Sequence, residues 1–521
     1  MRKRMLPIAV FVAGMTTLGV ELTASRLLGN VFGTSNLVWA NIIGLILVYL
    51  SAGYFIGGRW ADRSPYETTF YRLLSWAAFA SGLVPIVARP VLLGAASAVE
   101  RLDAAVMGGS FIAVLVLFSV PVTLLGCVSP FAIRLAIQDT ERAGRVAGRI
   151  YALSTLGSIL GTFLPVLMLI PLIGTARTFL TLSLTLMVVG LTGLGLTDRR
   201  SLLLHLWMPL VLVALSWLTM GGSIKNTVGQ IYETESAYNY IQVVERDGVR
   251  FLLLNEGQGI HSVYAPDQLA TYGTWDFFLS ALFFSDPPVE TDTVERMGLV
   301  GLAAGTIAKQ YTQVFGPIPI DGWEIDPEII AVGREFFDMR EPNLNAIAAD
   351  GRWGLEHSSH RYSVIGVDAY RPPYIPWHLT TREFFESVHE HLLPDGAIVI
   401  NVGRTPEDMR LVEALVGTLS TVFPSVHVVE VPSAFNAIVY ATVQPSSSEN
   451  LIRNLEILRK RDDVHPLLID VLQRTAENLQ PTPKTEIVFT DDKAPVEQLV
   501  NSIVIRYVLG SGLGLGPVIE P

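Results

Sequence analysis

The chain has 521 residues, of which 50% are hydrophobic and only 16% are charged, whereas about 25% are charged in an ordinary soluble domain. This composition argues against a wholly soluble protein and excludes disordered and collagen-like chains. The single cysteine, Cys127, excludes an intramolecular disulfide and a cysteine-rich zinc site. The net charge of −11 is uneven: residues 1–222 hold 16 basic and 8 acidic residues, and residues 223–521 hold 21 and 40. The acidic C-terminal part disfavours nucleic acid as a partner.

Residues 1–222 contain seven apolar stretches of about the 20 residues that a helix needs to cross a bilayer. They lie near 8–28, 37–58, 69–88, 108–128, 150–173, 177–196 and 201–220. Of the basic residues that flank them, twelve lie on one side and three on the other, which predicts a cytoplasmic N-terminus. We therefore expect a multi-pass domain of about seven helices in the cell membrane, with the lipid bilayer as a partner.

Residues 223–290 are predicted to form a β-hairpin subdomain and a linker. Two short runs rich in β-branched and aromatic residues, 240–245 and 251–254, are separated by Asp247-Gly248. An Asp-Gly pair between two such runs is typical of a tight hairpin turn.

Residues 291–445 alternate between strand-like and helix-like segments. The expected strands are 297–302, 318–325, 362–367 and 397–402, with a third strand in chain order before Asp350, and the expected helices are 306–315, 327–337, 381–393 and 405–422. This alternation predicts a doubly wound, largely parallel α/β sheet with helices on both faces. Residues 446–521 are expected to be a helical region and a tail that frays from Gly510.

Glycines and acids cluster where the predicted strands end. The loop Gly301-Leu302-Ala303-Ala304-Gly305 follows the first strand, and Glu324 and Asp326 end the second. Asp350 and Asp368 follow the third and fourth strands. Open α/β sheets bind ligands at this edge, where small residues admit a nucleoside and an acid accepts hydrogen bonds from ribose hydroxyls. Each acid taken alone is explained equally well as a helix cap. The spacing of the histidines predicts no metal site.

The order of these motifs resembles the spermidine synthases, which are polyamine aminopropyltransferases, over about residues 230–405. The matching segments are Glu235-Ser236-Ala237-Tyr238-Asn239, Leu254-Asn255-Glu256-Gly257-Gln258, the glycine loop, Glu324-Ile325-Asp326, Asp350-Gly351 and Val367-Asp368. With the apolar N-terminal half and residues 490–497, the chain resembles the membrane-embedded, fused spermidine synthase-like proteins.

The resemblance implies a Rossmann-like domain of the S-adenosylmethionine-dependent methyltransferase type and a role for each matching residue. Asp368 is the implied catalytic residue, which accepts a proton from the attacking amine. The implied ligands of decarboxylated S-adenosylmethionine are Asn239, Gln258, Gly301, Gly305, Glu324, which holds the ribose, and Asp350, which holds the adenine amino group. The implied acceptor site consists of Tyr238, Tyr272, Asp368 and Arg371. The resemblance also implies a homo-oligomer.

Two departures from the family pattern leave alternatives open. Ala304 replaces the aspartate that grips the aminopropyl amine, so ordinary S-adenosylmethionine and methyl transfer form an alternative. Arg371 replaces a second aspartate and suits a carboxylate or phosphate on the acceptor, which is either a small amine or a lipid. A non-catalytic transporter or sensor with a degenerate nucleoside-binding domain is the third reading.

Seven crossings from a cytoplasmic N-terminus would place the C-terminal part outside, whereas a nucleoside ligand favours the cytoplasm. The weakest crossing is 201–220, which contains His205 and Pro209. A re-entrant course there, or an additional pass near 90–99, removes the conflict. We therefore expect a cytoplasmic C-terminal domain.

Overall fold

The computed structural model describes residues 2–32, 36–101, 106–137, 140–219, 227–255, 259–370, 375–432 and 434–510. These residues form two compact units. The helical unit comprises Met1–Thr227 with Glu233–Tyr240, and the α/β unit comprises Val228–Tyr232 with Ile241–Pro521. Two residues of the expected site, Gln258 and Arg371, lie outside the described residues.

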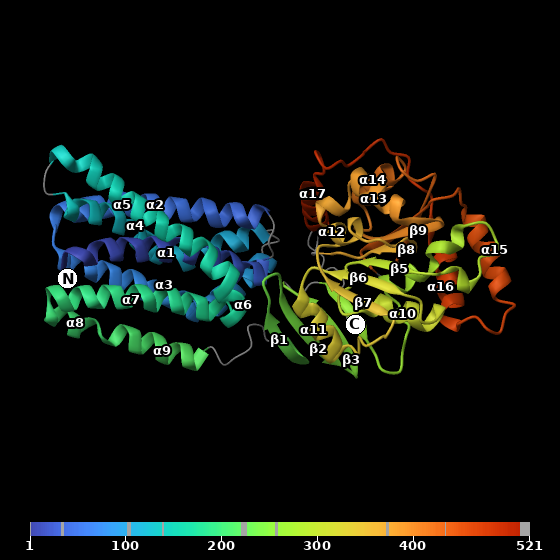
Figure 1. The fold of residues 1–521 in the computed structure, drawn as a ribbon, viewed down its shortest axis with the longest axis horizontal. Coiled ribbons are helices and arrows are strands. Elements are labelled where there is room, and N and C mark those ends of the chain that lie inside the picture. Colours follow the sequence, from blue (N-terminus) through green and yellow to red (C-terminus); the bar gives the residue numbers. More distant parts are fainter. Residues whose placement is uncertain are drawn as a thin grey trace. The chain divides into compact units, whose positions relative to one another are not determined.

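The helical unit contains the expected apolar helices (Figure 1). Its elements are α1 (Arg2–Phe32), α2 (Asn36–Arg63), α3 (Glu67–Arg101), α4 (Val106–Ala136), η1 (Thr140–Arg142), α5 (Ala143–Leu164), the π-helical η2 (Pro165–Leu169), α6 (Ile170–Ile173), α7 (Thr175–Thr197), α8 (Arg199–His205) and α9 (Trp207–Thr219). Seven segments of these helices are long and apolar enough to cross a membrane, and each overlaps one predicted stretch. They are candidate spans by length and composition.

Glycines let two of these helices approach at backbone distance. A Cβ atom on Gly157 or Gly161 of α5 would collide with the backbone oxygens of Phe11 or Met15 in α1. Small residues at such contacts are typical of helices packed in membranes, where close van der Waals contact drives association.

The seventh candidate span, Arg199–Thr219, is interrupted. A turn at Leu206 separates α8 from α9, and Pro209 lies in the first turn of α9. Proline suits a helix start because it lacks the N–H group that would bond to the preceding turn. The segment that the sequence indicates as the weakest crossing is therefore a 21-residue candidate span with a one-residue turn at Leu206.

A small sheet begins the α/β part of the chain, in the order β1-β2-β3-β4. Its strands are β1 (Gln230–Glu235), β2 (Tyr240–Arg246), β3 (Val249–Leu254) and β4 (Ile260–Tyr264). The predicted hairpin is confirmed, because β2 and β3 pair antiparallel around Asp247 and Gly248. Both turn residues have positive φ values, 50° and 79°, as the favoured two-residue hairpin turn requires.

The large sheet has the order β12-β10-β11-β9-β8-β5-β6-β7. Its strands are β5 (Met297–Val300), β6 (Ile320–Glu324), β7 (Leu344–Ala348), β8 (Tyr362–Val367), β9 (Leu392–Gly403), β10 (Ser425–Glu430), β11 (Asn436–Thr442) and β12 (Leu479–Gln480). The five strands from β9 to β7 are parallel, in the order typical of a Rossmann sheet. The remaining three are antiparallel, so the expectation of a largely parallel sheet is corrected to a mixed sheet.

Helices cover both faces of this sheet (Figure 1). They are η3 (Thr274–Phe284), η4 (Thr291–Thr293), α10 (Thr306–Phe315), α11 (Pro327–Phe336), α12 (Gly351–Glu356), η5 (Trp377–Leu379), α13 (Arg382–His391), α14 (Arg410–Leu419), α15 (Ser448–Leu458), α16 (Pro466–Glu477) and α17 (Val496–Gly510). One buried apolar cluster joins η3, α10, α15 and α16 to the sheet, and a second joins α13, α14 and α17 to it. The region expected to be helical after residue 445 also contributes β12, because Leu479 and Gln480 pair with β10.

Candidate active site

The carboxyl ends of β5, β6 and β8 meet at one edge of the sheet. Gly301, just beyond β5, donates its backbone N–H to Trp323 O of β6 at 3.0 Å. On the other side of β5, Asp368 donates its N–H to Val300 O at 2.8 Å. The glycine loop, Glu324 and Asp368 therefore lie at the edge at which open α/β sheets bind ligands.

The glycine loop requires glycine at its first position. Gly301 has φ +90°, and a Cβ atom there would lie 2.5 Å from Ala369 N and 2.6 Å from Asp368 O. The loop is also held from outside, since Ala304 donates its N–H to Ser262 Oγ at 2.9 Å. Gly305 has φ +87° and begins α10. The loop backbone is thus packed against the backbone of Asp368, the residue expected to be catalytic.

Glu324 ends β6 and is only 8% exposed. Its Oε2 accepts the N–H of Ala303 at 3.0 Å, and its Oε1 accepts the N–H of Asp326 at 3.1 Å. Burial raises the pKa of Glu324 to about 7, although these backbone hydrogen bonds oppose the shift. Backbone bonds to both oxygens fix the orientation of the carboxyl group.

Both carboxylate oxygens of Asp350 contact other parts of the protein. Its Oδ1 caps α12 by accepting the N–H of Trp353 at 3.0 Å, as the helix-cap reading expects. Its Oδ2 lies 3.1 Å from His378 Nε2, and this hydrogen bond is the main reason that the pKa of Asp350 is lowered. Asp326 caps α11 in the same way, by accepting the N–H of Glu328. Both oxygens of Asp350 therefore have a protein partner, and these two contacts fix the orientation of its carboxylate.

Asp368 lies immediately after β8, is partly exposed, and is surrounded by hydrogen-bond donors. Asn401 of β9 donates its Nδ2–H to Asp368 Oδ1 at 2.9 Å, and the indole of Trp275 also hydrogen-bonds to this carboxyl group. Asn436 of β11 donates to Asn401 Oδ1 at 2.8 Å, which turns the Asn401 amide group so that its nitrogen faces Asp368. Burial raises the pKa of Asp368 to about 7, and the two side-chain hydrogen bonds oppose the shift.

Trp275, Asn401 and Asn436 were not among the residues predicted from the sequence. Asn401 carried a usable signal, because it is a polar residue inside the apolar strand run 397–402. A buried polar side chain in such a strand needs a hydrogen-bond partner. Trp275 and Asn436 had no comparable signal, since only the fold brings η3 and β11 next to Asp368.

Tyr272 lies on an ordered loop with its side chain 66% exposed. Its backbone has φ 54° and donates its N–H to Oδ2 of the fully buried Asp276 at 2.9 Å. Asp276 also accepts hydrogen bonds from Gln310 Nε2 at 2.6 Å and from Arg474 Nη2 at 2.8 Å. The Arg474 guanidinium lies 5.4 Å from the centre of the Tyr272 ring, within cation–π range. An exposed Tyr272 ring supported in this way is suited to contact a ligand. Asp276 and Arg474, which support it, were not among the residues predicted from the sequence.

Tyr238 and Asn239 belong to the helical unit, in the turn between β1 and β2. Ser236 Oγ accepts the N–H groups of Tyr238 at 3.0 Å and Asn239 at 2.9 Å. Arg26 of α1 donates to the carbonyl oxygens of Ser236 and Tyr238. Glu235 accepts the N–H of Thr175, at the start of α7, at 2.8 Å. The turn that carries two of the expected ligands is therefore anchored to α1 and α7.

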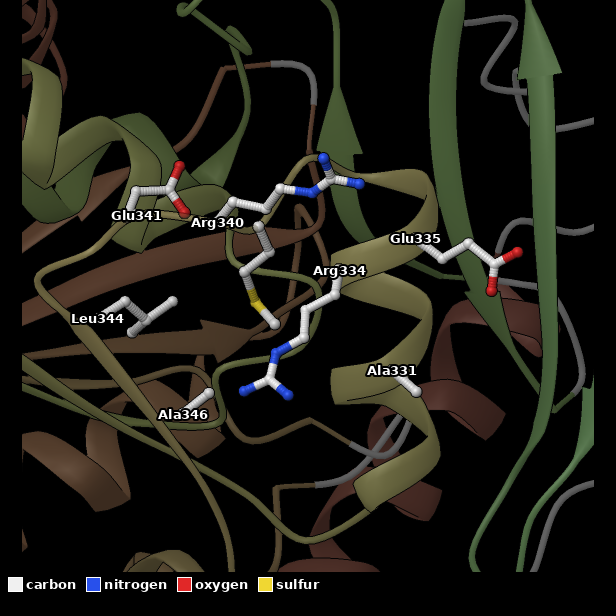
Figure 2. A pocket seen from close by; sticks show the side chains of 8 residues that line it. Ala331, Arg334, Glu335, Arg340, Glu341, Leu344 and Ala346 are labelled. Atoms are coloured by element: carbon white, nitrogen blue, oxygen red, sulfur yellow. The ribbon is translucent and has the colours of Figure 1, made fainter.

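Neither a metal-binding cluster nor the hollow along α11 adds to this site in the part of the chain that the structure describes. Among the described residues, no group of three or more His, Cys, Asp or Glu side chains is arranged to hold a metal ion. A hollow of about 690 Å³ lies along α11 and β7, and Figure 2 shows Arg334 extending from α11 toward Ala346. None of the expected site residues lines this hollow.

Comparison with known proteins gives matches in the C-terminal part of the chain. Residues 318–453 match the family profile described as "Spermine/spermidine synthase domain". A "Probable polyamine aminopropyl transferase" of Bifidobacterium longum is 32% identical over 283 residues, covering 51% of this chain and 61% of the relative. A "Polyamine aminopropyltransferase" of Chromobacterium violaceum is 30% identical over 202 residues, covering 38% of this chain and 71% of the relative.

The chain spans about six tenths of the length of the relatives from Bifidobacterium longum and Vibrio vulnificus, the second also named "Polyamine aminopropyltransferase". Among solved structures, a probable spermidine synthase from Corynebacterium glutamicum is 19% identical with a TM-score of 0.38. That alignment covers 50% of this chain and 98% of the other.

Proposed function

Because this chain belongs to the polyamine aminopropyltransferase family, we propose that its α/β unit transfers an aminopropyl group from decarboxylated S-adenosylmethionine to an amine. The observation that carries the proposal is the position of Asp368. The backbone of Asp368 lies against Gly301 at the ligand-binding edge of the sheet, the residue is partly exposed, and the pKa of its carboxyl group is raised to about 7.

The proposed reaction is a displacement at carbon. The amine nitrogen forms a bond to the propyl carbon attached to the sulfonium, the carbon–sulfur bond breaks, and its electron pair stays on sulfur, which leaves methylthioadenosine. The amine must be unprotonated to attack, yet a free alkylamine with a pKa near 10.4 is mostly charged at pH 7. Asp368 binds the amine and takes the proton that the nitrogen loses. A general base works best when its pKa lies near the operating pH, as it does here.

For the nucleoside we propose the ligands that the resemblance implies. Glu324 accepts hydrogen bonds from the ribose hydroxyls, and Asp350 accepts one from the adenine amino group. Fixed orientation supports the first role, because both oxygens of Glu324 are held by backbone N–H groups. A lowered pKa, which keeps the carboxylate an acceptor, supports the second. Asn239 and Gln258 complete the proposed nucleoside site, and Tyr238, Tyr272 and Arg371 the proposed acceptor site.

Methyl transfer from ordinary S-adenosylmethionine is the second candidate. It is favoured by Ala304, which is buried and neutral at the position where the family's aspartate grips the aminopropyl amine. Without that carboxylate the site does not repel the α-carboxylate of the ordinary cofactor. The acceptor in either case is a small amine or an amine carried by a lipid.

A binding and turnover experiment on the full chain in detergent separates these readings. We expect calorimetry to show tighter binding of decarboxylated than of ordinary S-adenosylmethionine, and the opposite preference would favour methyl transfer. Asp368→Asn should keep nucleoside binding but lower turnover by about 10²–10⁴-fold, the usual contribution of a general base. Unchanged turnover would remove Asp368 from the mechanism. No binding of either nucleoside would favour a transporter or sensor.

We also propose that the helical unit spans the cell membrane and that the α/β unit is cytoplasmic. The candidate span Arg199–Thr219 contains a one-residue turn at Leu206 and Pro209 in the first turn of α9, and these features support a re-entrant course. If α8 and α9 enter the membrane without crossing it, the chain crosses six times. The α/β unit then lies on the same side of the membrane as the N-terminus, which is predicted to be cytoplasmic. The test places single cysteines in a Cys127→Ser background. Tyr66→Cys reports on a loop predicted to be cytoplasmic, and Lys460→Cys reports on the α/β unit. Neither cysteine should react with a membrane-impermeant maleimide in intact cells. Labelling of Lys460→Cys alone would place the α/β unit outside.

A further inference from the structure

The segment 489–493, which precedes α17, is tied to two helices at the proposed nucleoside site. Phe489 O accepts the N–H of Arg382 at 2.9 Å, at the start of α13. Asp491 Oδ1 accepts the hydroxyl of Thr381, the cap of the same helix, at 2.7 Å. The proposed chemistry gives residues 489–493 no role.

Asp491 also forms a two-pronged ion pair with α12. Nη1 and Nη2 of Arg352 donate to its Oδ1 and Oδ2 at 2.7 and 2.8 Å. Paired hydrogen bonds of this kind fix the relative orientation of the two side chains as well as their distance. Arg352 Nε also bonds to Glu356 Oε1 at 2.9 Å, so the guanidinium group is held on two of its edges.

From Arg352 the contacts continue to Asp350. Arg352 Nη1 donates to the backbone oxygen of His378 at 3.2 Å, and His378 Nε2 lies 3.1 Å from Asp350 Oδ2. Asp350 in turn caps α12, the six-residue helix that carries Arg352. A helix this short is marginal by itself and depends on tertiary contacts for its position.

We propose that Asp491 and Arg352 are positioning residues, which hold α12 and His378 so that Asp350 presents its carboxylate to the nucleoside base. The inference rests on the proposed function, since it takes Asp350 as a ligand of the base. The pair acts through orientation more than through global stability. Arg352 and Asp491 are 19% and 39% exposed, and partly exposed ion pairs contribute little to the free energy of unfolding.

The test measures methylthioadenosine binding and the kinetics of the full chain with decarboxylated S-adenosylmethionine. Asp491→Asn and Arg352→Lys should each raise the Kd for methylthioadenosine and the KM for the nucleoside substrate about tenfold, while kcat changes less than twofold. Asp491→Glu, which keeps the charge, should recover part of the affinity. Because the pair acts through His378, adding His378→Phe to Asp491→Asn should raise Kd less than the two separate effects multiplied.

Asp463→Asn is the matched control. Asp463 pairs with Arg461 at 2.7 Å through a similar two-pronged contact, and Kd should stay at the wild-type value when this pair is broken. Wild-type Kd in Asp491→Asn, or a Kd that rises equally in the control, would overturn the inference. A loss of affinity accompanied by a lowered Tm and not recovered by Asp491→Glu would also overturn it. Failure of the wild-type chain to bind methylthioadenosine would instead count against the proposed function.

Discussion

At the scale of single residues, the carboxyl groups of the candidate site differ in their protonation behaviour. Burial raises the pKa of Glu324 and Asp368 to about 7, whereas the hydrogen bond from His378 lowers the pKa of Asp350. Such divergence is typical of sites in which acids divide the work of binding and proton transfer. On the proposed mechanism, Asp350 remains an acceptor while Asp368 takes up and releases a proton near neutral pH.

The hydrogen bond from Asn401 to Asp368 should tune the pH dependence of the reaction. Its N–H stabilises the ionised carboxylate, so Asn401→Leu should raise the pKa of Asp368 further. The reaction needs the carboxylate, so kcat/KM should fall as pH drops through about 7 in the wild type, and at a higher pH in the variant. A pH–rate profile measures the shift. Asn436→Leu, which leaves the Asn401 donor in place, should move the profile less, and an unmoved profile in both variants would contradict the role of this bond.

The raised pKa of Asp368 also predicts that the site is stabilised when the charge is removed. Between about pH 4 and pH 7 the folded chain binds the proton that the unfolded chain has released, so this group lowers stability as pH rises through that interval. The change is at most about 1.4 kcal/mol for each pH unit. Asp368→Asn should therefore have a higher Tm than the wild type, by more at pH 7.5 than at pH 5. A gap that does not widen with pH would contradict the raised pKa.

At the scale of elements, the turn from β5 into α10 joins backbone geometry to the proposed chemistry. Gly301 adopts φ +90° in contact with the backbone of Asp368, whereas Gly316, after α10, adopts φ +85° with nothing within 4 Å of an added Cβ atom. The two glycines share a positive φ and differ in the space available for a side chain. Alanine substitutions at the two positions therefore distinguish the cost of backbone strain from the cost of a steric collision.

Substitution of these two glycines should have unequal effects. Gly316→Ala should lower the free energy of unfolding by about 1–3 kcal/mol, because φ +85° with ψ −173° is a backbone conformation that alanine adopts only under strain. Gly301→Ala should lower it by more, because the backbone of Asp368 and Ala369 must also move, and it should impair turnover. Denaturant or thermal unfolding with parallel activity measurements gives the comparison. Equal losses of stability and activity in the two variants would contradict a direct coupling of the loop to Asp368.

At the scale of the whole molecule, the helical unit has an apolar surface whose exposure to water is unfavourable. Leu172 is 74% exposed and Trp217 is 82% exposed, and many other large apolar side chains on these helices are also exposed. Large contiguous apolar surfaces mark contact with a lipid phase or another protein. In the α/β unit, by contrast, large apolar side chains fill two clusters on the faces of the sheet.

The membrane proposal therefore predicts how the chain fractionates. Expressed in cells, it should sediment with membranes, stay there after extraction with alkaline carbonate, and dissolve in mild detergent. Salt should not release it, because the attachment is apolar and not ionic. Release by carbonate would show peripheral attachment and would contradict a multi-pass helical unit.

Local patterns in the sequence determined the elements. The seven apolar stretches each overlap a candidate span, and the strand at 362–367 and the helix at 306–315 have the predicted bounds. These features depend on the periodicity and capping of neighbouring residues, which a single sequence displays. The positions of Gly301, Glu324, Asp350 and Asp368 after successive strands follow for the same reason, although their roles, and those of Gln258 and Arg371, remain predictions.

Only the tertiary structure decided which distant residues meet. Trp275, Asn401 and Asn436 converge on Asp368, and Asp491 reaches Arg352, through contacts between segments far apart in the chain. The antiparallel strands β10 to β12 likewise depend on pairing partners that no local pattern specifies. Hydrogen bonds of this kind form wherever the packed layers bring a donor and an acceptor together. Sequence periodicity therefore specifies that an element exists and which face it buries, while the fold alone selects the polar contacts around the reacting carboxyl group.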